Sequence, residues 1–258
     1  MGIAHHIKFG RWALLTLLTM PIILNLDGGH GWLIFQMLKL PSVRICFVGE
    51  SFVNGTGDPE CLGWAGRICV NANKNGYDIT YYNLGVRRET SAELKDRWQR
   101  EVSYRLTKEY DGRVVFSFGT NDTTIENGKT RINFADSIEN TRAILSEAKQ
   151  LYPVLMISPA PVIDEEQNHR VSDLSKQFAL VCSEINVPYL DVFSKLKKSN
   201  IWLNEAQAAE SGGVFREGVS PSHPQLFKRN DGAHPRTAGY KEFAEIVQNW
   251  EAWLNWFK

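Results

Sequence analysis

Residues 43–58 read Val-Arg-Ile-Cys-Phe-Val-Gly-Glu-Ser-Phe-Val-Asn-Gly-Thr-Gly-Asp, and the rest of the chain is organised around them. An apolar, β-prone run ends at Gly49, and Glu50 and Ser51 follow in a loop with two more glycines. In α/β proteins, a strand, a glycine turn and a single hydroxyl present a nucleophile at the carboxyl end of a strand. The stretch therefore predicts that Ser51 is a nucleophile if the chain supplies a base and donors for an oxyanion.

Patterns typical of strands and helices alternate along the rest of the chain. Apolar or β-branched runs predict strands at residues 78–84, 113–118, 154–157 and 188–192. Apolar stripes at helical spacing predict helices at residues 61–75, 89–106, 134–151, 172–185 and 238–256. Together with residues 43–48 this gives five strands that alternate with helices, which implies a parallel sheet with helices on both faces.

The composition is that of an ordinary globular protein. The 258 residues are 43% apolar and 22% charged, enough for one sizeable core. Lys plus Arg and Asp plus Glu number 29 each, so no net field attracts nucleic acid or anionic lipid. The four cysteines form no Cys-x-x-Cys pair and no zinc-like cluster, which favours a reducing, cytoplasmic compartment. No metal or cofactor is predicted.

Residues 1–41 differ in character from the rest of the chain. A basic start and an apolar run at residues 12–26 are typical of a secretory signal or a short membrane anchor. The run is short for a span, which needs about 20 residues. The alternative is that this leader lies outside the native fold and that Met37 is the true start. We therefore expect one domain at residues 42–258, with secretion or membrane contact only if the apolar run acts as a signal or anchor.

Residues 205–230 are irregular and rich in Gly, Ser and Pro. A stretch of this length is unusual for a loop in a compact domain, so it predicts either a lid or a disordered insertion. Four aromatic side chains along the chain are candidates to line an acyl or sugar site, with core packing favoured for at least the first of them. These residues are Trp64, Trp202, Phe215 and Phe227.

Of the six histidines, His234 is the candidate base for Ser51. It lies in the sequence Asp231-Gly-Ala-His-Pro235, where a carboxylate precedes a histidine by three residues on a turn. Asp231 is placed to accept the second ring N–H and to fix the tautomer, which leaves the other nitrogen to face the serine. The sequence therefore predicts a triad of Ser51, His234 and Asp231.

An attacked carbonyl oxygen becomes negative and needs hydrogen-bond donors. The candidates are the backbone N–H groups of Ser51 and Gly85 and the side-chain amide of Asn121, which all follow predicted strands. Taken alone, each of these signals is weak, because turns and helix caps use the same residues. Their order along the chain and their positions at strand ends make the set specific.

These motifs resemble those of the SGNH hydrolases, also called GDSL-type esterases and lipases, from about Val43 to the C-terminus. The family's four marker residue types are matched by Ser51, Gly85, Asn121 and His234. Glu50 stands where the family usually has Asp, which keeps the charge. The resemblance implies a three-layer α/β/α fold with a flavodoxin-like five-stranded parallel sheet. It also implies metal-independent hydrolysis of a small-molecule ester such as an acyl lipid or acylated sugar.

The residues leave other functions open. An O-acyltransferase would use the same acyl-enzyme and pass the acyl group to an alcohol instead of water. A non-catalytic protein that binds carbohydrate or lipid would keep the scaffold alone. A nucleotide-binding function is disfavoured, because the loop after Gly49 has neither Gly-x-Gly-x-x-Gly nor a Lys-Ser/Thr pair.

Overall fold

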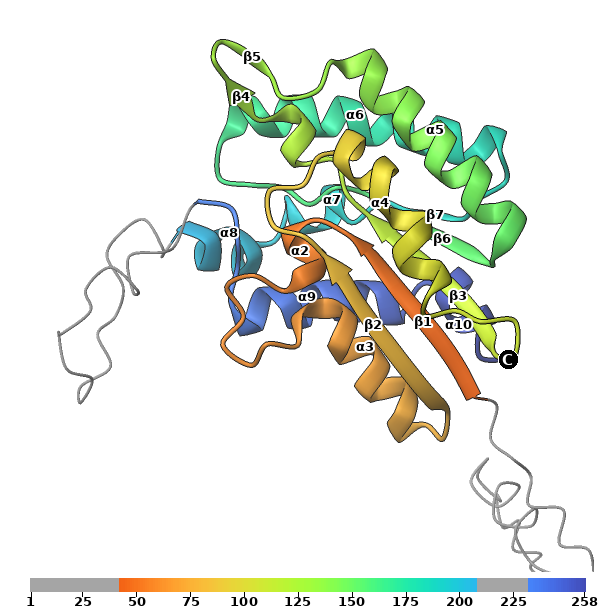
Figure 1. Cartoon of the computed structure of the whole chain (residues 1–258). Coiled ribbons are helices and arrows are strands. Elements are labelled where there is room, and N and C mark those ends of the chain that lie inside the picture. The colour runs from red at the N-terminus through yellow and green to blue at the C-terminus, as the bar shows by residue number, and fades with distance from the viewer. Residues whose placement is uncertain (1–41, 208–231) are drawn as a thin grey trace, which may run out of the picture. The chain divides into compact units, whose positions relative to one another are not determined.

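The computed structural model describes residues 42–207 and 232–258. Its main feature is a five-stranded parallel sheet in the order β2-β1-β3-β6-β7 (Figure 1). The strands are β1 (Ser42–Gly49), β2 (Asp78–Gly85), β3 (Asp111–Ser117), β6 (Val154–Ile157) and β7 (Tyr189–Leu190). This is the flavodoxin-like order, so the predicted fold class is confirmed.

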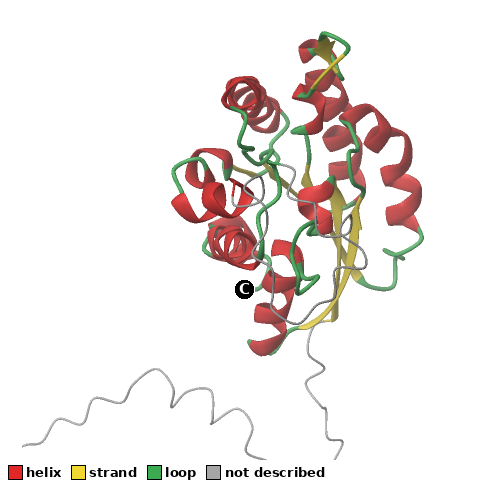
Figure 2. Ribbon diagram, turned by 90° about the vertical axis from the view of Figure 1, so that its left-hand side faces the viewer, coloured by secondary structure: helices red, strands yellow, loops and turns green. Residues whose placement is uncertain are grey.

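Helices cover both faces of the sheet (Figure 2). One face carries α3 (Gly63–Lys74), α9 (Thr237–Gln248) and α10 (Glu251–Asn255), and the other carries α4 (Ser91–Ser103), α5 (Phe134–Leu151) and α6 (Glu165–Glu184). The interior strand β1 contributes to both layers, because its side chains alternate between them. Ile45 and Phe47 pack into the first layer, and Cys46 and Val48 pack into the second. All four are buried, as expected for an interior parallel strand.

The strands end level with one another at their carboxyl edge. Gly49 at the end of β1 pairs with Gly85 on one side and with Ser117 on the other. The loops that follow these three strands therefore leave the sheet at the same edge. This register brings together Ser51, Gly85 and Asn121, which the sequence places after different strands.

Several short elements were not predicted. They are the helices α2 (Ser51–Asn54), α7 (Phe193–Leu196) and α8 (Asn200–Gln207), the 3-10 helix η1 (Asn121–Thr123), and a hairpin of β4 (Ile125–Glu126) and β5 (Lys129–Thr130). The hairpin turns at Asn127 and Gly128, which both have positive φ, as a two-residue turn of this kind requires. Figure 1 shows the hairpin projecting beyond the body of the sheet.

The prediction for α6 was wrong at its start. The helix begins at Glu165, seven residues before the predicted residue 172. Asp164 caps it by accepting the backbone N–H of Gln167 at 2.6 Å, and two glutamates follow in the first turn, where acidic groups are favourable. Residues 164–170, which include His169, are therefore the cap and the first turns of a helix.

The predicted last helix is in fact two. α9 ends at Gln248, and Trp250 has an extended backbone (φ −79°, ψ 127°) before α10 begins. The break turns Trp253 into the core, where its ring lies 6.4 Å from that of Phe47. Packing of this tryptophan against β1 gives a physical reason for the break, which the helical spacing did not reveal.

Some sequence predictions fall outside the described residues. The leader at residues 1–41 is among them, as is most of the predicted lid, of which residues 205–207 end α8. In the part of the chain that the structure describes, no helix is long and apolar enough to span a bilayer.

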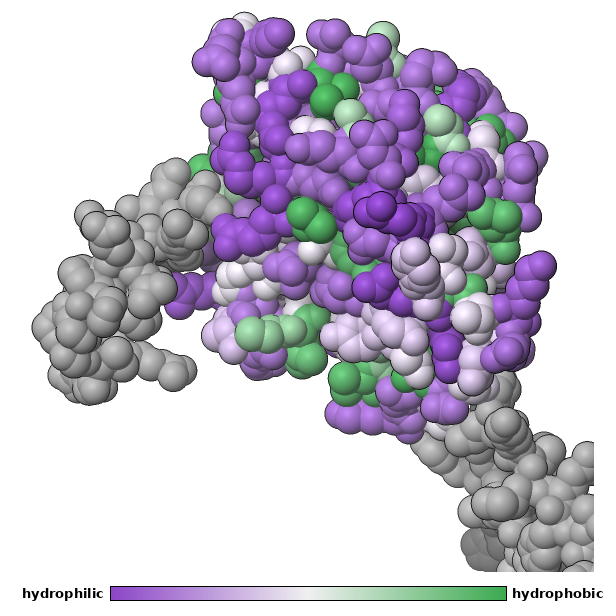
Figure 3. Space-filling view, in the orientation of Figure 1, coloured by the Kyte–Doolittle hydropathy of each residue, from purple (hydrophilic) through white to green (hydrophobic). Residues whose placement is uncertain are grey.

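The large aromatic residues are mostly internal. Trp64 and Trp202 are fully buried, so both belong to the core and do not line an open site. Phe215 and Phe227 lie outside the described residues. On the face drawn in Figure 3 the surface is largely hydrophilic, and the apolar groups are scattered.

Candidate active site

The turn after β1 places Ser51 at the carboxyl edge of the sheet. Gly49 allows the turn, because a Cβ there would lie 1.9 Å from the carbonyl oxygen of Ser117 on β3. Ser51 begins α2, and Gly55 caps the carboxyl end of that helix in the left-handed conformation (φ 80°). The serine is 5% exposed, so its hydroxyl lies in a largely desolvated position.

His234 meets Ser51 although 183 positions separate them. The His234 Nε2 and Ser51 Oγ atoms are 2.6 Å apart, within hydrogen-bond distance. The ring of Phe52 lies 4.9 Å from the histidine ring, centroid to centroid. The structure thus brings the predicted nucleophile and base into contact. Asp231, the predicted third member, lies outside the described residues.

The loop that carries His234 is held by Glu205 of α8. The Glu205 carboxylate accepts the backbone N–H groups of Arg236 at 2.9 Å, Ala238 at 3.2 Å and Gly239 at 2.6 Å. These are unpaired donors of the first turn of α9, so Glu205 caps the helix that begins just after the histidine. The sequence did not point to this role, because the cap comes from a distant element.

We expect Glu205→Ala to destabilise the protein by about 1–2 kcal/mol, because three N–H groups at the start of α9 lose their acceptor. It should also lower kcat/KM by about tenfold through displacement of His234. Urea unfolding and ester hydrolysis measure the two effects. Glu245→Ala is the matched control, since Glu245 is exposed on α9, the helix that Glu205 caps. Equal stability and activity in the two variants would contradict the role of Glu205.

A second support for the histidine loop is Asp58, which follows the nucleophile turn. Its carboxylate accepts the N–H of Gly63 at 2.8 Å, pairs with Arg67, and accepts the hydroxyl of Thr237 at 3.2 Å. Burial alone would raise the pKa of Asp58, but the bonds from Arg67 and from backbone N–H groups outweigh it and lower the pKa to about 2. Asp58 is therefore an ionised tie between the loop after Ser51 and the start of α9.

Two of the expected oxyanion donors are engaged within the protein. The Gly85 N–H donates to Asn83 Oδ1 at 3.0 Å. The Asn121 side-chain nitrogen lies 2.7 Å from Glu50 Oε2 and 3.0 Å from the carbonyl oxygen of Glu89. These donors must exchange partners to bind an oxyanion. The glycine at 85 has a packing reason too, because a Cβ there would lie 2.2 Å from the N atom of Asn54.

A buried ion pair, which the sequence did not reveal, lies next to the Asn121 amide and the end of β1. Glu89 and Arg97 form a salt bridge with side chains only 4% and 14% exposed. Arg97 Nη2 also donates to the carbonyl oxygen of Leu84 at 2.8 Å and to that of Gly49 at 3.3 Å. The pair thus ties α4 to the carboxyl ends of β1 and β2, next to Ser51.

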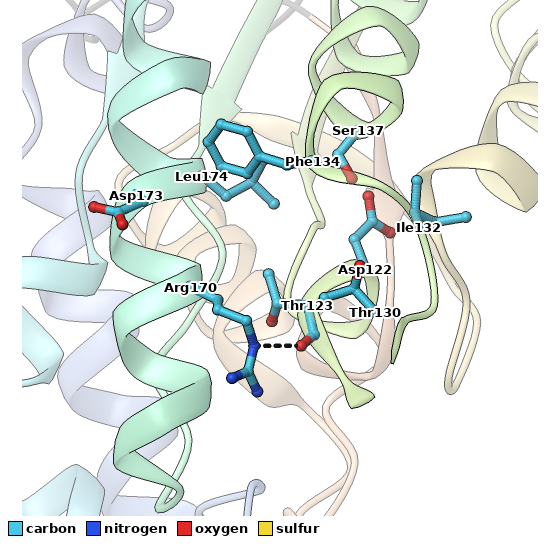
Figure 4. Close-up of a pocket in the computed structure, with 9 residues that line it drawn as sticks. All are labelled: Asp122, Thr123, Thr130, Ile132, Phe134, Ser137, Arg170, Asp173 and Leu174. Atoms are coloured by element: carbon cyan, nitrogen blue, oxygen red, sulfur yellow. Dashed lines mark hydrogen bonds between the residues drawn. The ribbon is translucent and has the colours of Figure 1, made fainter. Parts of the chain in front are cut away.

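A cavity of about 310 Å³ lies beside this region, bordered by η1, the loop before α5 and one side of α6 (Figure 4). Arg170 donates from Nε to the carbonyl oxygen of Thr123 at 2.9 Å at its rim. Ser51 and His234, the predicted catalytic residues that the structure describes, do not line it. Within residues 42–207 and 232–258, no group of three or more His, Cys, Asp or Glu side chains is arranged to hold a metal ion.

Comparison with known proteins identifies the family of this chain. The chain belongs to the GDSL-like lipase/acylhydrolase family, because the family model matches residues 47–242. A search of curated proteins gave no significant match.

Solved structures with this fold include enzymes of the same family. A lipase/acylhydrolase from Enterococcus faecalis gives a TM-score of 0.58 at 19% identity, with 80% of this chain and 93% of that chain covered. An acetylxylan esterase from Geobacillus stearothermophilus gives 0.57 at 15% identity, with 83% and 98% covered. A lipolytic protein of the G-D-S-L family from Veillonella parvula gives 0.55 at 16% identity, with 80% and 96% covered. At these identities the likeness establishes the fold.

Proposed function

We propose that the protein is a serine hydrolase that cleaves carboxylic esters. The observation that carries the proposal is the 2.6 Å separation of Ser51 Oγ and His234 Nε2 in a member of the GDSL family. A serine hydroxyl is a weak nucleophile at neutral pH unless a base takes its proton. His234 is within reach of that proton, and the level ends of β1, β2 and β3 support the choice of oxyanion donors from the residues that end or follow these strands.

In the proposed reaction, Ser51 Oγ attacks the acyl carbon of the ester while His234 Nε2 takes the hydroxyl proton. His234 then gives that proton to the leaving alcohol, and the acyl group remains on Ser51. Water, activated by the same histidine, releases the acid and restores the serine. Asp231 would orient His234, and the donors of Ser51, Gly85 and Asn121 would hold the oxyanion.

A solved relative supports the assignment of Asp231. Structures of the Geobacillus stearothermophilus acetylxylan esterase include catalytic mutants in which a serine, an aspartate and a histidine are each replaced by alanine. The aspartate precedes the histidine by three positions in that enzyme. Asp231 precedes His234 by the same interval in this chain, which is the spacing that an aspartate–histidine pair on one turn allows.

The substrate is proposed to be a small-molecule ester, either an acyl lipid or an acylated sugar. We expect the purified protein to hydrolyse p-nitrophenyl acetate well above the uncatalysed rate. A panel of p-nitrophenyl esters from two to sixteen carbons, together with acetylated sugars, separates short-chain esterase, lipase and carbohydrate deacetylase. A heat-denatured sample is the control. Absence of turnover on the whole panel by a folded sample would refute the proposed function.

A further inference from the structure

Glu50 is a buried acid surrounded by hydrogen-bond donors from another loop. Its side chain lies next to the nucleophile in sequence and is 1% exposed. Oε1 accepts the backbone N–H of Thr120 at 3.2 Å, and Oε2 accepts the backbone N–H of Asn121 at 3.2 Å. Oε2 also accepts the side-chain amide of Asn121 at 2.7 Å. One carboxylate thus joins the turn after β1 to the loop after β3.

These contacts fix the plane of the Asn121 amide. One of the Nδ2 hydrogens goes to Glu50, and the other goes to the carbonyl oxygen of Glu89 at 3.0 Å. The bond to the carboxylate is shorter and charge-assisted, whereas the bond to the carbonyl is neutral and weaker. An oxyanion that competes for Nδ2 will therefore displace the Glu89 carbonyl before it displaces Glu50.

We propose that Glu50 is a positioning residue of the oxyanion hole: it anchors one hydrogen of the Asn121 amide and leaves the other to exchange from Glu89 to the oxyanion. The inference rests on the proposed ester hydrolysis. Glu50 does not touch the reacting atoms in this scheme and acts through Asn121. The three donors that it accepts keep the amide in place between turnovers.

The surroundings of Glu50 make this anchor sensitive to pH. Burial raises the pKa of Glu50 to about 7, although the backbone N–H of Asn121 and donors of Thr120 counteract it, and Asp122 raises it further. Other charged or titratable groups nearby are Glu89 and Arg97 behind the Asn121 amide and His234 beyond Ser51. Glu50 thus changes charge near neutrality, and the hydrogen bond to Nδ2 is strongest when Glu50 is ionised.

A kinetic cycle tests the proposal. A glutamine at 50 offers one acceptor oxygen and an NH₂ group, so at least one donor loses its partner. We expect Glu50→Gln to lower kcat about 10- to 100-fold with KM changed less than about twofold, and Asn121→Ala to lower kcat about 100- to 1,000-fold. The double variant should be no slower than Asn121→Ala, because Glu50 acts through that residue. Effects that multiply instead would overturn the proposal.

A control and a second measurement separate this inference from the proposed function. Glu147→Gln, an exposed substitution on α5, should keep the activity of the wild type. The side-chain NH₂ signals of Asn121, assigned in a two-dimensional ¹⁵N spectrum by their loss in Asn121→Ala, should shift with pH with a midpoint near 7. Glu50→Gln should lose most of that shift. If the wild type hydrolyses no ester, the proposed function fails, and this spectrum still decides whether Glu50 holds Asn121. An equal shift in both proteins, or none in the wild type, would overturn the inference.

Discussion

Replacing Ser51 with alanine is expected to lower kcat/KM for p-nitrophenyl acetate by about 10⁴- to 10⁶-fold, the range found when the nucleophile of a serine hydrolase is removed. In the proposed reaction, the hydroxyl that His234 contacts at 2.6 Å supplies the atom that bonds to the acyl carbon. Neither neighbour of Ser51 can take over as nucleophile. The Glu50 carboxylate is buried and hydrogen-bonded to Asn121, and Phe52 is apolar. Initial rates of 4-nitrophenol release measure the effect.

A control variant and a labelling experiment test whether the loss of activity is specific to Ser51. Ser103→Ala removes an exposed hydroxyl at the end of α4, which bonds only to its own turn at the carbonyl oxygen of Arg100, and it should leave activity unchanged. A fluorophosphonate probe should label the wild type at Ser51 and leave the alanine variant unlabelled. Equal turnover in wild type and Ser51→Ala, or labelling at another serine, would remove Ser51 as the nucleophile.

The second large effect is expected on stability. Arg97→Met should lower the free energy of unfolding by about 3–5 kcal/mol, because it leaves the buried Glu89 carboxylate without its partner. The carbonyl oxygens of Gly49 and Leu84 lose a donor at the same time. Urea unfolding monitored by circular dichroism measures the change. Adding Glu89→Gln should recover part of the loss, since no unpaired buried charge then remains at this position.

An exposed ion pair gives the matched comparison. Lys176 and Asp173 on α6 are 2.9 Å apart, with side chains 69% and 65% exposed. Lys176→Met should change the free energy of unfolding by less than about 1 kcal/mol, because water and salt screen such a pair. If both methionine variants unfold at the same urea concentration, the Glu89–Arg97 pair is not the buried tie that its contacts indicate.

The parts of the fold that were predicted are those with a strong local pattern. The sequence of β1 alternates between two apolar layers, and the apolar stripe of α5 gave both ends of that helix correctly. The glycine at position 49 marked the turn, because only a residue without a side chain fits against Ser117. The Ser51–His234 contact followed from combining two motifs with the rule that ligands bind at the carboxyl edge of a parallel sheet.

The features that were missed depend on contacts between distant segments. The motif at Glu50 indicates only a charge-conserving change, whereas the hydrogen-bond partners of this side chain lie about seventy positions away on the loop after β3. No local sequence pattern indicates that Glu205 caps α9. The same holds for the Glu89–Arg97 ion pair. The start of α6 was predicted seven residues too late, because the first two turns of the helix are charged and lack the apolar stripe that indicates a helix in a sequence.

The 183 positions between Ser51 and His234 also bear on how the molecule acquires activity. The histidine loop reaches the serine by docking on the segment after α2, where the hydroxyl of Tyr240 donates to the carbonyl oxygen of Thr56 at 2.7 Å. A contact of such long sequence separation closes a large loop and forms late, after the local helices. During synthesis on the ribosome, the nucleophile emerges long before its base. The proposed hydrolysis would therefore begin only after α9 has docked, and its appearance would report that step.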